Sequence, residues 1–103
     1  MKEHLEDLQD ELENNEAVLV DVREQNEWNA GHITGAIFVP LSTLKEGQYP
    51  NFEKIDKKKK YLYCRSGNRV HAAKSLLDSM GYKQVITLSE GFSELSAEGF
   101  PSE

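Results

Sequence analysis

The polar residues that follow Tyr63 are the ones in this chain whose types and spacing could do covalent chemistry. They are Cys64, Arg65, Ser66, Gly67, Asn68 and Arg69. A deprotonated cysteine is a strong nucleophile, and arginines can hold an anionic group through paired N–H donors. Glycine lets successive backbone N–H groups turn inward around an anion. The composition therefore predicts that Cys64 is a catalytic thiolate and that residues 65–69 bind an anionic substrate.

The segments on either side of Cys64 predict that this residue lies at the edge of a sheet. Residues 61–63 read as a short buried strand, and residues 69–80 read as a helix with one apolar face. Inward amides and a helix N-terminus favour negative charge, so we expect them to lower the pKa of Cys64. The alternative is that Cys64 is a small buried apolar residue at a strand end, a role that needs no nearby arginine or glycine.

The rest of the chain alternates short apolar strands with helices. Strands are predicted over residues 17–22, 36–39 and 85–88, and helices over residues 24–30 and 92–98, with one further turn capped by Ser42. This alternation predicts an α/β fold with a mainly parallel sheet and helices on both faces. Ligands of such folds bind at the carboxyl ends of the strands, which is where Cys64 falls.

Length and composition indicate one small globular domain. The chain has 103 residues, of which 38% are hydrophobic and 29% are charged. Its single cysteine cannot form an internal disulfide, and one cysteine with three histidines makes a poor metal site, so no metal and no cofactor are expected. The strongly apolar run at 17–20 is too short to span a bilayer, and the first residues do not resemble a signal peptide. A cytoplasmic protein with no membrane partner is therefore expected.

The net charge of −6 comes from the N-terminal segment. Residues 1–16 hold seven acidic residues and one lysine, which leaves eleven of each sign in residues 17–103. Because nucleic acid binding needs a basic stripe, this distribution excludes nucleic acid as the main partner. Leu5, Leu8 and Leu12 lie on one face of a predicted amphipathic helix. We therefore divide the chain into an acidic N-terminal helix, residues 1–16, which packs on the rest or docks a partner, and a domain over residues 17–103.

Three separated segments together resemble the signatures of a single-domain rhodanese, a sulfurtransferase. The first is the six-residue loop 64–69, which is similar to the active loop of that family. The second comprises residues 20–23, 27–28 and 31–36, and the third comprises residues 91–92 and 99–101. The chain departs from the family at Phe38, Glu90 and Leu95, where asparagine, glycine and tryptophan are common. These departures lie outside the active loop, so they concern local packing more than chemistry.

The resemblance implies a single rhodanese-like domain with a central parallel sheet of about five strands. It also implies that the Cys64 thiolate takes the outer sulfur of thiosulfate, or of another persulfide donor, and becomes a persulfide. Cyanide or a thiol, a protein thiol included, would then accept that sulfur, as in other two-step covalent catalysis. Asp21 and Arg23 belong to the signature and are expected to be structural residues near the site.

Two other classes of protein remain open. Cysteine phosphatases and arsenate reductases also place a cysteine in an anion-binding loop, but the phosphatase pattern has five residues between cysteine and arginine. Here Cys64 and Arg69 have four between them. A sulfur carrier or regulatory binding module without turnover is the second alternative. His71 could approach Cys64 from the following helix, although His71 and His32 are more simply explained as a surface and a structural histidine. The four lysines at 57–60 are predicted to form a solvated turn.

Overall fold

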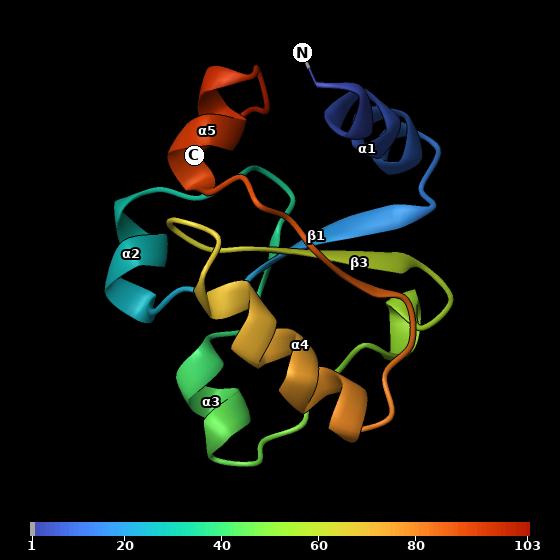
Figure 1. Cartoon of the computed structure of the whole chain (residues 1–103), viewed down its shortest axis with the longest axis vertical. Helices are drawn as coiled ribbons and strands as arrows, with labels where there is room; N and C mark the ends of the chain where they lie inside the picture. Colours follow the sequence, from blue (N-terminus) through green and yellow to red (C-terminus); the bar gives the residue numbers. More distant parts are fainter. Residues whose placement is uncertain (1) are drawn as a thin grey trace.

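Four short parallel strands form the centre of the molecule, in a computed structural model that describes residues 2–103. They are β1 (Ala17–Asp21), β2 (Ile37–Phe38), β3 (Lys59–Tyr63) and β4 (Val85–Thr87). The sheet has the order β2-β1-β3-β4, and every neighbouring pair is parallel (Figure 1). The predicted α/β fold with a parallel sheet is confirmed, with four strands in the described residues where about five were expected.

Helices cover both faces of this sheet. In Figure 1, α1 (Glu3–Glu13) and α5 (Phe92–Ala97) lie above the sheet, and α3 (Leu41–Lys45) and α4 (Arg69–Ser79) lie below it. The short helix α2 (Gln25–Ala30) follows β1, and a single 3₁₀ turn, η1 (Glu53–Ile55), precedes β3. No helix within residues 2–103 is long and apolar enough to cross a membrane.

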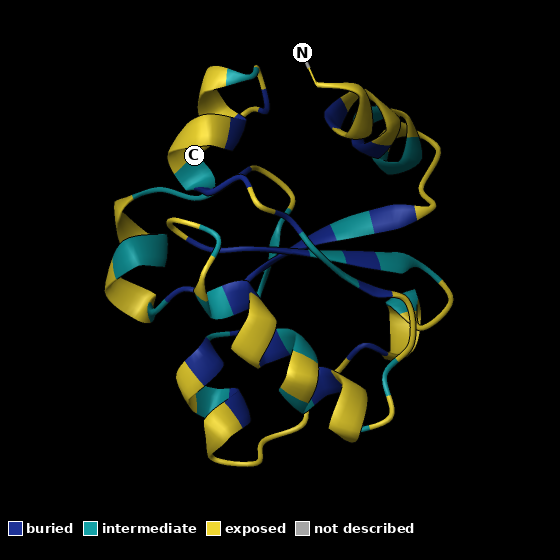
Figure 2. Ribbon diagram, viewed as in Figure 1, coloured by how far each residue is buried: buried dark blue, intermediate teal, exposed yellow. Residues whose placement is uncertain are grey.

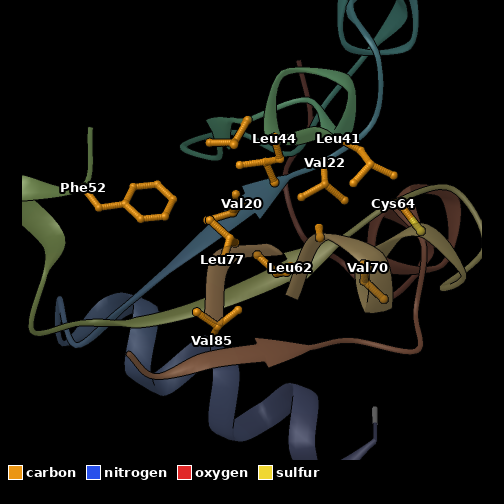
Figure 3. Close-up of a cluster of buried hydrophobic side chains, with 12 residues drawn as sticks. Val20, Val22, Leu41, Leu44, Phe52, Leu62, Cys64, Val70, Leu77 and Val85 are labelled. Atoms are coloured by element: carbon orange, nitrogen blue, oxygen red, sulfur yellow. The ribbon is translucent and has the colours of Figure 1, made fainter. Parts of the chain in front are cut away.

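The alternation of side chains along the strands produces two hydrophobic cores. Successive strand residues point to opposite faces, so Val20 and Leu62 pack with α3 and α4, whereas Leu19 and Tyr63 pack with α1 and α5. Figure 2 shows the resulting pattern, with buried strands at the centre and exposed outer faces on the helices. Cys64 belongs to the first core, and Figure 3 shows it at one end of that cluster beside Val70.

Helix α1 is packed on the sheet through its apolar face. Leu5 and Leu8 have no exposed surface and lie in the second core, while most of the acidic residues of α1 face solvent. The helix ends at Glu13 with Asn14 at its C-cap. One turn after Leu8, the Glu11 carboxylate pairs with Lys59 at 2.5 Å and accepts a hydrogen bond from Tyr61. The helix therefore contacts the sheet through both apolar and charged groups.

Two local predictions from sequence are wrong. Strand β3 begins at Lys59, and Lys60 is fully buried rather than part of a solvated turn. Its ammonium group donates to three backbone carbonyls, those of Asp56 at 2.9 Å and of Lys58 and Lys83 at 3.0 Å each. Ser42 is not a cap, because it lies inside α3 and donates to the Glu24 carboxylate at 2.6 Å. Each side chain has one partner in a distant segment, Lys83 for Lys60 and Glu24 for Ser42, which local sequence patterns do not reveal.

Candidate active site

Cys64 lies immediately after β3, at the carboxyl edge of the sheet, and five residues before the first residue of α4. Its side chain has no exposed surface. The sulfur Sγ accepts a hydrogen bond from the backbone N–H of Gly67, with 3.1 Å between the two atoms. The strand thus delivers the sulfur to the point where the loop and the start of the helix turn their amides toward it.

The surroundings of Cys64 favour its thiolate form. Burial by itself raises the pKa of the thiol, but backbone N–H groups of Ser66, Arg69, Gly67 and Val70 lower it by more, so the net pKa lies below the ordinary value. These donors come from the loop and from the first turn of α4, whose N–H groups have no partner within the helix. The direction is the one expected from the sequence, and it makes the sulfur a better nucleophile near neutral pH.

Gly67 is required by the conformation of the loop. Its φ is +83°, which side chains disfavour, and a Cβ at this position would come within 2.7 Å of the Ser89 carbonyl oxygen. The loop can therefore turn its amides toward Cys64 only because residue 67 has no side chain.

The two arginines of the loop have different surroundings. Arg65 is exposed and forms no side-chain hydrogen bond or ion pair with any residue from 2 to 103. Arg69 instead donates to both carboxylate oxygens of Glu27, at 2.6 and 2.8 Å. This pairing lowers the pKa of Glu27 to about 2 and raises that of Arg69. Ser66 and Asn68 are exposed on the outer side of the loop.

A shallow open cavity of about 250 Å³ lies beside the loop. It is lined by Arg65 and by residues of α2, α5 and the segment after β1, namely Arg23, Glu27, Ala30, Gly31, Phe92 and Ser93. Arg23 and Glu27 in this lining are paired with Asp21 and Arg69, whereas Arg65 has no ion-pair partner among residues 2–103. A small anion that enters the cavity therefore meets an excess of positive charge close to the loop.

Asp21 and Arg23 form a buried network at the same edge of the sheet. Arg23 Nη2 lies 2.8 Å from Asp21 Oδ2 and donates to the Gly31 carbonyl at 2.6 Å. The guanidinium carbon also lies 4.6 Å from the centre of the Phe92 ring. The pair therefore ties the end of β1 to α2 and α5, next to the loop but without contact to the sulfur.

The segment 89–92 supports the active loop from behind, which the sequence analysis missed. The N–H of Phe92 donates to the Cys64 carbonyl at 2.9 Å, and a Cβ at Gly91 would lie 1.8 Å from the Arg65 carbonyl oxygen. The sequence signal was the glycine itself, since a glycine after a strand often marks a close approach of two backbones.

Neither of the two histidines considered from sequence reaches the sulfur. His71 is exposed on α4. His32 stacks on Trp28 with the ring centres 3.5 Å apart, and its Nδ1 lies 3.0 Å from the Trp28 carbonyl oxygen. Within residues 2–103, no cluster of three or more histidine, cysteine, aspartate or glutamate side chains is placed to hold a metal ion.

Comparisons with known proteins agree on one family. The sequence profile of the Rhodanese-like domain matches residues 4–98. The uncharacterized protein YqhL of Bacillus subtilis is 43% identical over 76 residues, which are 74% of this chain and 58% of that protein. A tRNA uridine(34) hydroxylase of Buchnera aphidicola is 34% identical over 82% of this chain but only 28% of its own length. The chain thus spans less than two thirds of these curated relatives.

A solved structure of similar size gives a more complete match. The human single-domain sulfurtransferase TSTD1 superposes with a TM-score of 0.77 and 25% identity, over 91% of this chain and 93% of the human one. The fold of this chain is therefore one already known from a solved structure.

Proposed function

This chain belongs to the rhodanese-like family, and from that premise we propose that it is a sulfurtransferase that carries sulfur as a Cys64 persulfide. The observation that carries the proposal is the set of backbone N–H groups directed at the Cys64 sulfur, which lower the pKa of its thiol. The same donors would stabilise the negatively charged terminal sulfur of a persulfide, as an oxyanion hole stabilises oxygen.

The proposed first step is the attack of the Cys64 thiolate on the outer sulfur of thiosulfate. A new S–S bond forms at Cys64, the S–S bond of thiosulfate breaks, and sulfite leaves with the electron pair. Cyanide or a thiolate then attacks the terminal sulfur and takes it, which returns Cys64 to its thiolate form. Because Cys64 is the single cysteine of the chain, the persulfide cannot collapse to an internal disulfide, and the sulfur must pass to another molecule.

We propose distinct roles for the residues after Cys64. Arg65 holds the anionic end of the donor, because its guanidinium has no partner among residues 2–103 and lines the cavity beside the loop. Gly67 and Arg69 contribute backbone N–H groups, and the charge of the Arg69 side chain is matched by Glu27. Ser66 and Asn68 form the exposed rim that a donor or acceptor meets first.

The partners are proposed on chemical grounds. A small anion such as thiosulfate is small enough for the cavity, whose lining includes Arg65 but not Cys64, and a thiol, free or on a protein, is the acceptor a cell supplies. Neither nucleic acid nor a membrane is proposed as a partner, since the acidic residues concentrate on α1 and no basic stripe is present in the sequence. A reactive free cysteine is kept reduced in the cytoplasm, where we propose that the protein works.

Intact-protein mass spectrometry after incubation with thiosulfate tests this proposal. The expected result is a gain of one sulfur atom at Cys64 that is lost when cyanide is added. The control is Cys64→Ser, which retains the size of the side chain but removes the nucleophile and is expected to show neither change. If the wild-type protein gains no mass while Cys64 still reacts with iodoacetamide, thiosulfate is not the donor. If the C64S variant gains a labile sulfur as well, the assigned nucleophile is wrong.

A further inference from the structure

Glu90 is a buried carboxylate that the proposed chemistry does not use. Its side chain is 1% exposed and lies between β4 and α5. Lys2 Nζ donates to Oε2 at 2.9 Å, and His4 Nε2 lies 3.0 Å from both Glu90 oxygens. Both partners come from the beginning of α1, more than eighty residues away in the chain.

Lys2 and His4 counteract the effect of burial on the pKa of Glu90. Burial raises this pKa, but hydrogen bonds from His4 and Lys2 lower it by more than burial raises it, so the pKa falls to about 2. The negative charges of Glu94 and Glu98, in and just after α5, also raise the pKa of Lys2. Without Lys2 and His4, a charged group would remain buried and uncompensated, which proteins tolerate poorly. Helix α1 and the segment around Glu90 are therefore fastened to each other through this contact, on the face where α1 and α5 lie in Figure 1.

The residues on either side of Glu90 contact the active loop directly. A Cβ at Gly67 would come within 2.7 Å of the Ser89 carbonyl oxygen, and a Cβ at Gly91 would come within 1.8 Å of the Arg65 carbonyl oxygen. The Phe92 N–H donates to the Cys64 carbonyl at 2.9 Å. Because these backbone contacts are close, we expect a shift of the backbone at Glu90 to displace the loop whose N–H groups face Cys64.

We propose that Glu90 is a positioning residue for Cys64. Its contacts with Lys2 and His4 at the start of α1 hold segment 89–92 in place, so that the backbone N–H groups of the loop stay directed at the Cys64 sulfur. This inference goes beyond sulfur transfer, because it concerns the state of the thiolate whatever it attacks. Lys2 and His4, at the start of α1, thereby help to hold the active-site loop in place.

The test compares two ways of breaking the contact. One is the Lys2→Met/His4→Gln double variant, which changes half-exposed side chains; the other is Glu90→Ala. For each protein, the rate of Cys64 alkylation by iodoacetamide is measured across a pH series, together with kcat and KM for thiosulfate. We expect the midpoint of the alkylation profile to move to higher pH and kcat to fall roughly tenfold, with KM little changed. Glu90→Gln keeps the hydrogen-bond acceptor and is expected to restore most of the loss.

Glu11→Ala is the matched control, because it removes the contacts of α1 with Lys59 and Tyr61, which belong to β3 and not to the loop or to segment 89–92. It is expected to lower Tm and to leave the alkylation profile and kcat unchanged. The proposal is overturned if the double variant loses Tm but keeps the wild-type alkylation midpoint and kcat. If Glu90→Ala does not fold, the double variant decides. If wild-type protein does not use thiosulfate, the alkylation profile still tests Glu90, so failure of the two proposals can be distinguished.

Discussion

Substituting Gly91 by alanine is expected to damage the active site more than any change of similar size elsewhere. A Cβ at this position would lie 1.8 Å from the Arg65 carbonyl oxygen, 2.4 Å from the Arg65 carbonyl carbon and 3.0 Å from the Cys64 carbonyl oxygen. These atoms belong to the backbone, so no side-chain rotation relieves the clash. The φ of Gly91 is −91°, which alanine adopts without strain, so the whole effect is steric.

The size of the effect follows from the distances. Since Cβ contacts under 3.0 Å essentially do not occur, the Arg65 carbonyl must move by about 1.2 Å. A displacement of ~1 Å in catalytic geometry lowers the rate by roughly a hundredfold, and overpacking lowers stability by about 1–3 kcal/mol. We therefore expect kcat/KM for thiosulfate to fall about a hundredfold in a protein that still folds. The assay combines steady-state turnover, the rate of Cys64 alkylation and thermal unfolding.

Gly81→Ala is the matched control for this substitution. Gly81 follows α4, has a φ of +95°, and has no atom within 4 Å of the site where a Cβ would be. Backbone strain of about 1 kcal/mol is expected to lower Tm, with turnover and alkylation unchanged. If G91A keeps activity within a few-fold of wild type, the loop does not depend on the segment behind it, and the argument from close packing fails.

Two further predictions concern the ionised groups around the loop. In a double-mutant cycle of Glu27→Gln and Arg69→Ala, measured by urea unfolding, we expect a coupling of about 1–2 kcal/mol, because the pair is bidentate and partly buried; additive effects would mean that the ion pair contributes nothing. The pKa values of Glu27 and Glu90 are both about 2 in the folded protein, below the ordinary 4.5, so their stabilisation is present above pH 4.5 and is lost as the pH falls toward 2. Urea unfolding across that range should show a smaller loss of stability for E27Q than for wild type, and an equal loss would contradict the assignment.

The order of the elements and the position of Cys64 could be predicted because both depend on local patterns. The short apolar runs at residues 17–22 and 61–63 and the helical spacing of apolar residues after Arg69 are patterns among neighbouring residues. The lowered pKa of Cys64 followed from the same local arrangement of loop and helix.

The partners of the charged side chains could not be predicted from the sequence, because they are set by contacts between distant segments. Arg69 and Glu27 are 42 positions apart, and Glu90 lies 86 positions from His4. Lys60 stands in a run of four lysines, so its composition indicated solvent, yet the strand register places its ammonium group among three carbonyls. The chain has many residues of each charge, so the sequence does not say which of them form ion pairs. The fold determines which ones come close together.

The parallel sheet also constrains the order in which the site can be completed during synthesis. The central pair, β1 and β3, joins Ala17 with Lys59, and no hairpin is present in the described sheet to nucleate it locally. Residues 89–92, which brace the loop, leave the ribosome after Cys64 itself. Segment 89–92 can therefore support the loop around Cys64 only after most of the chain has been synthesised.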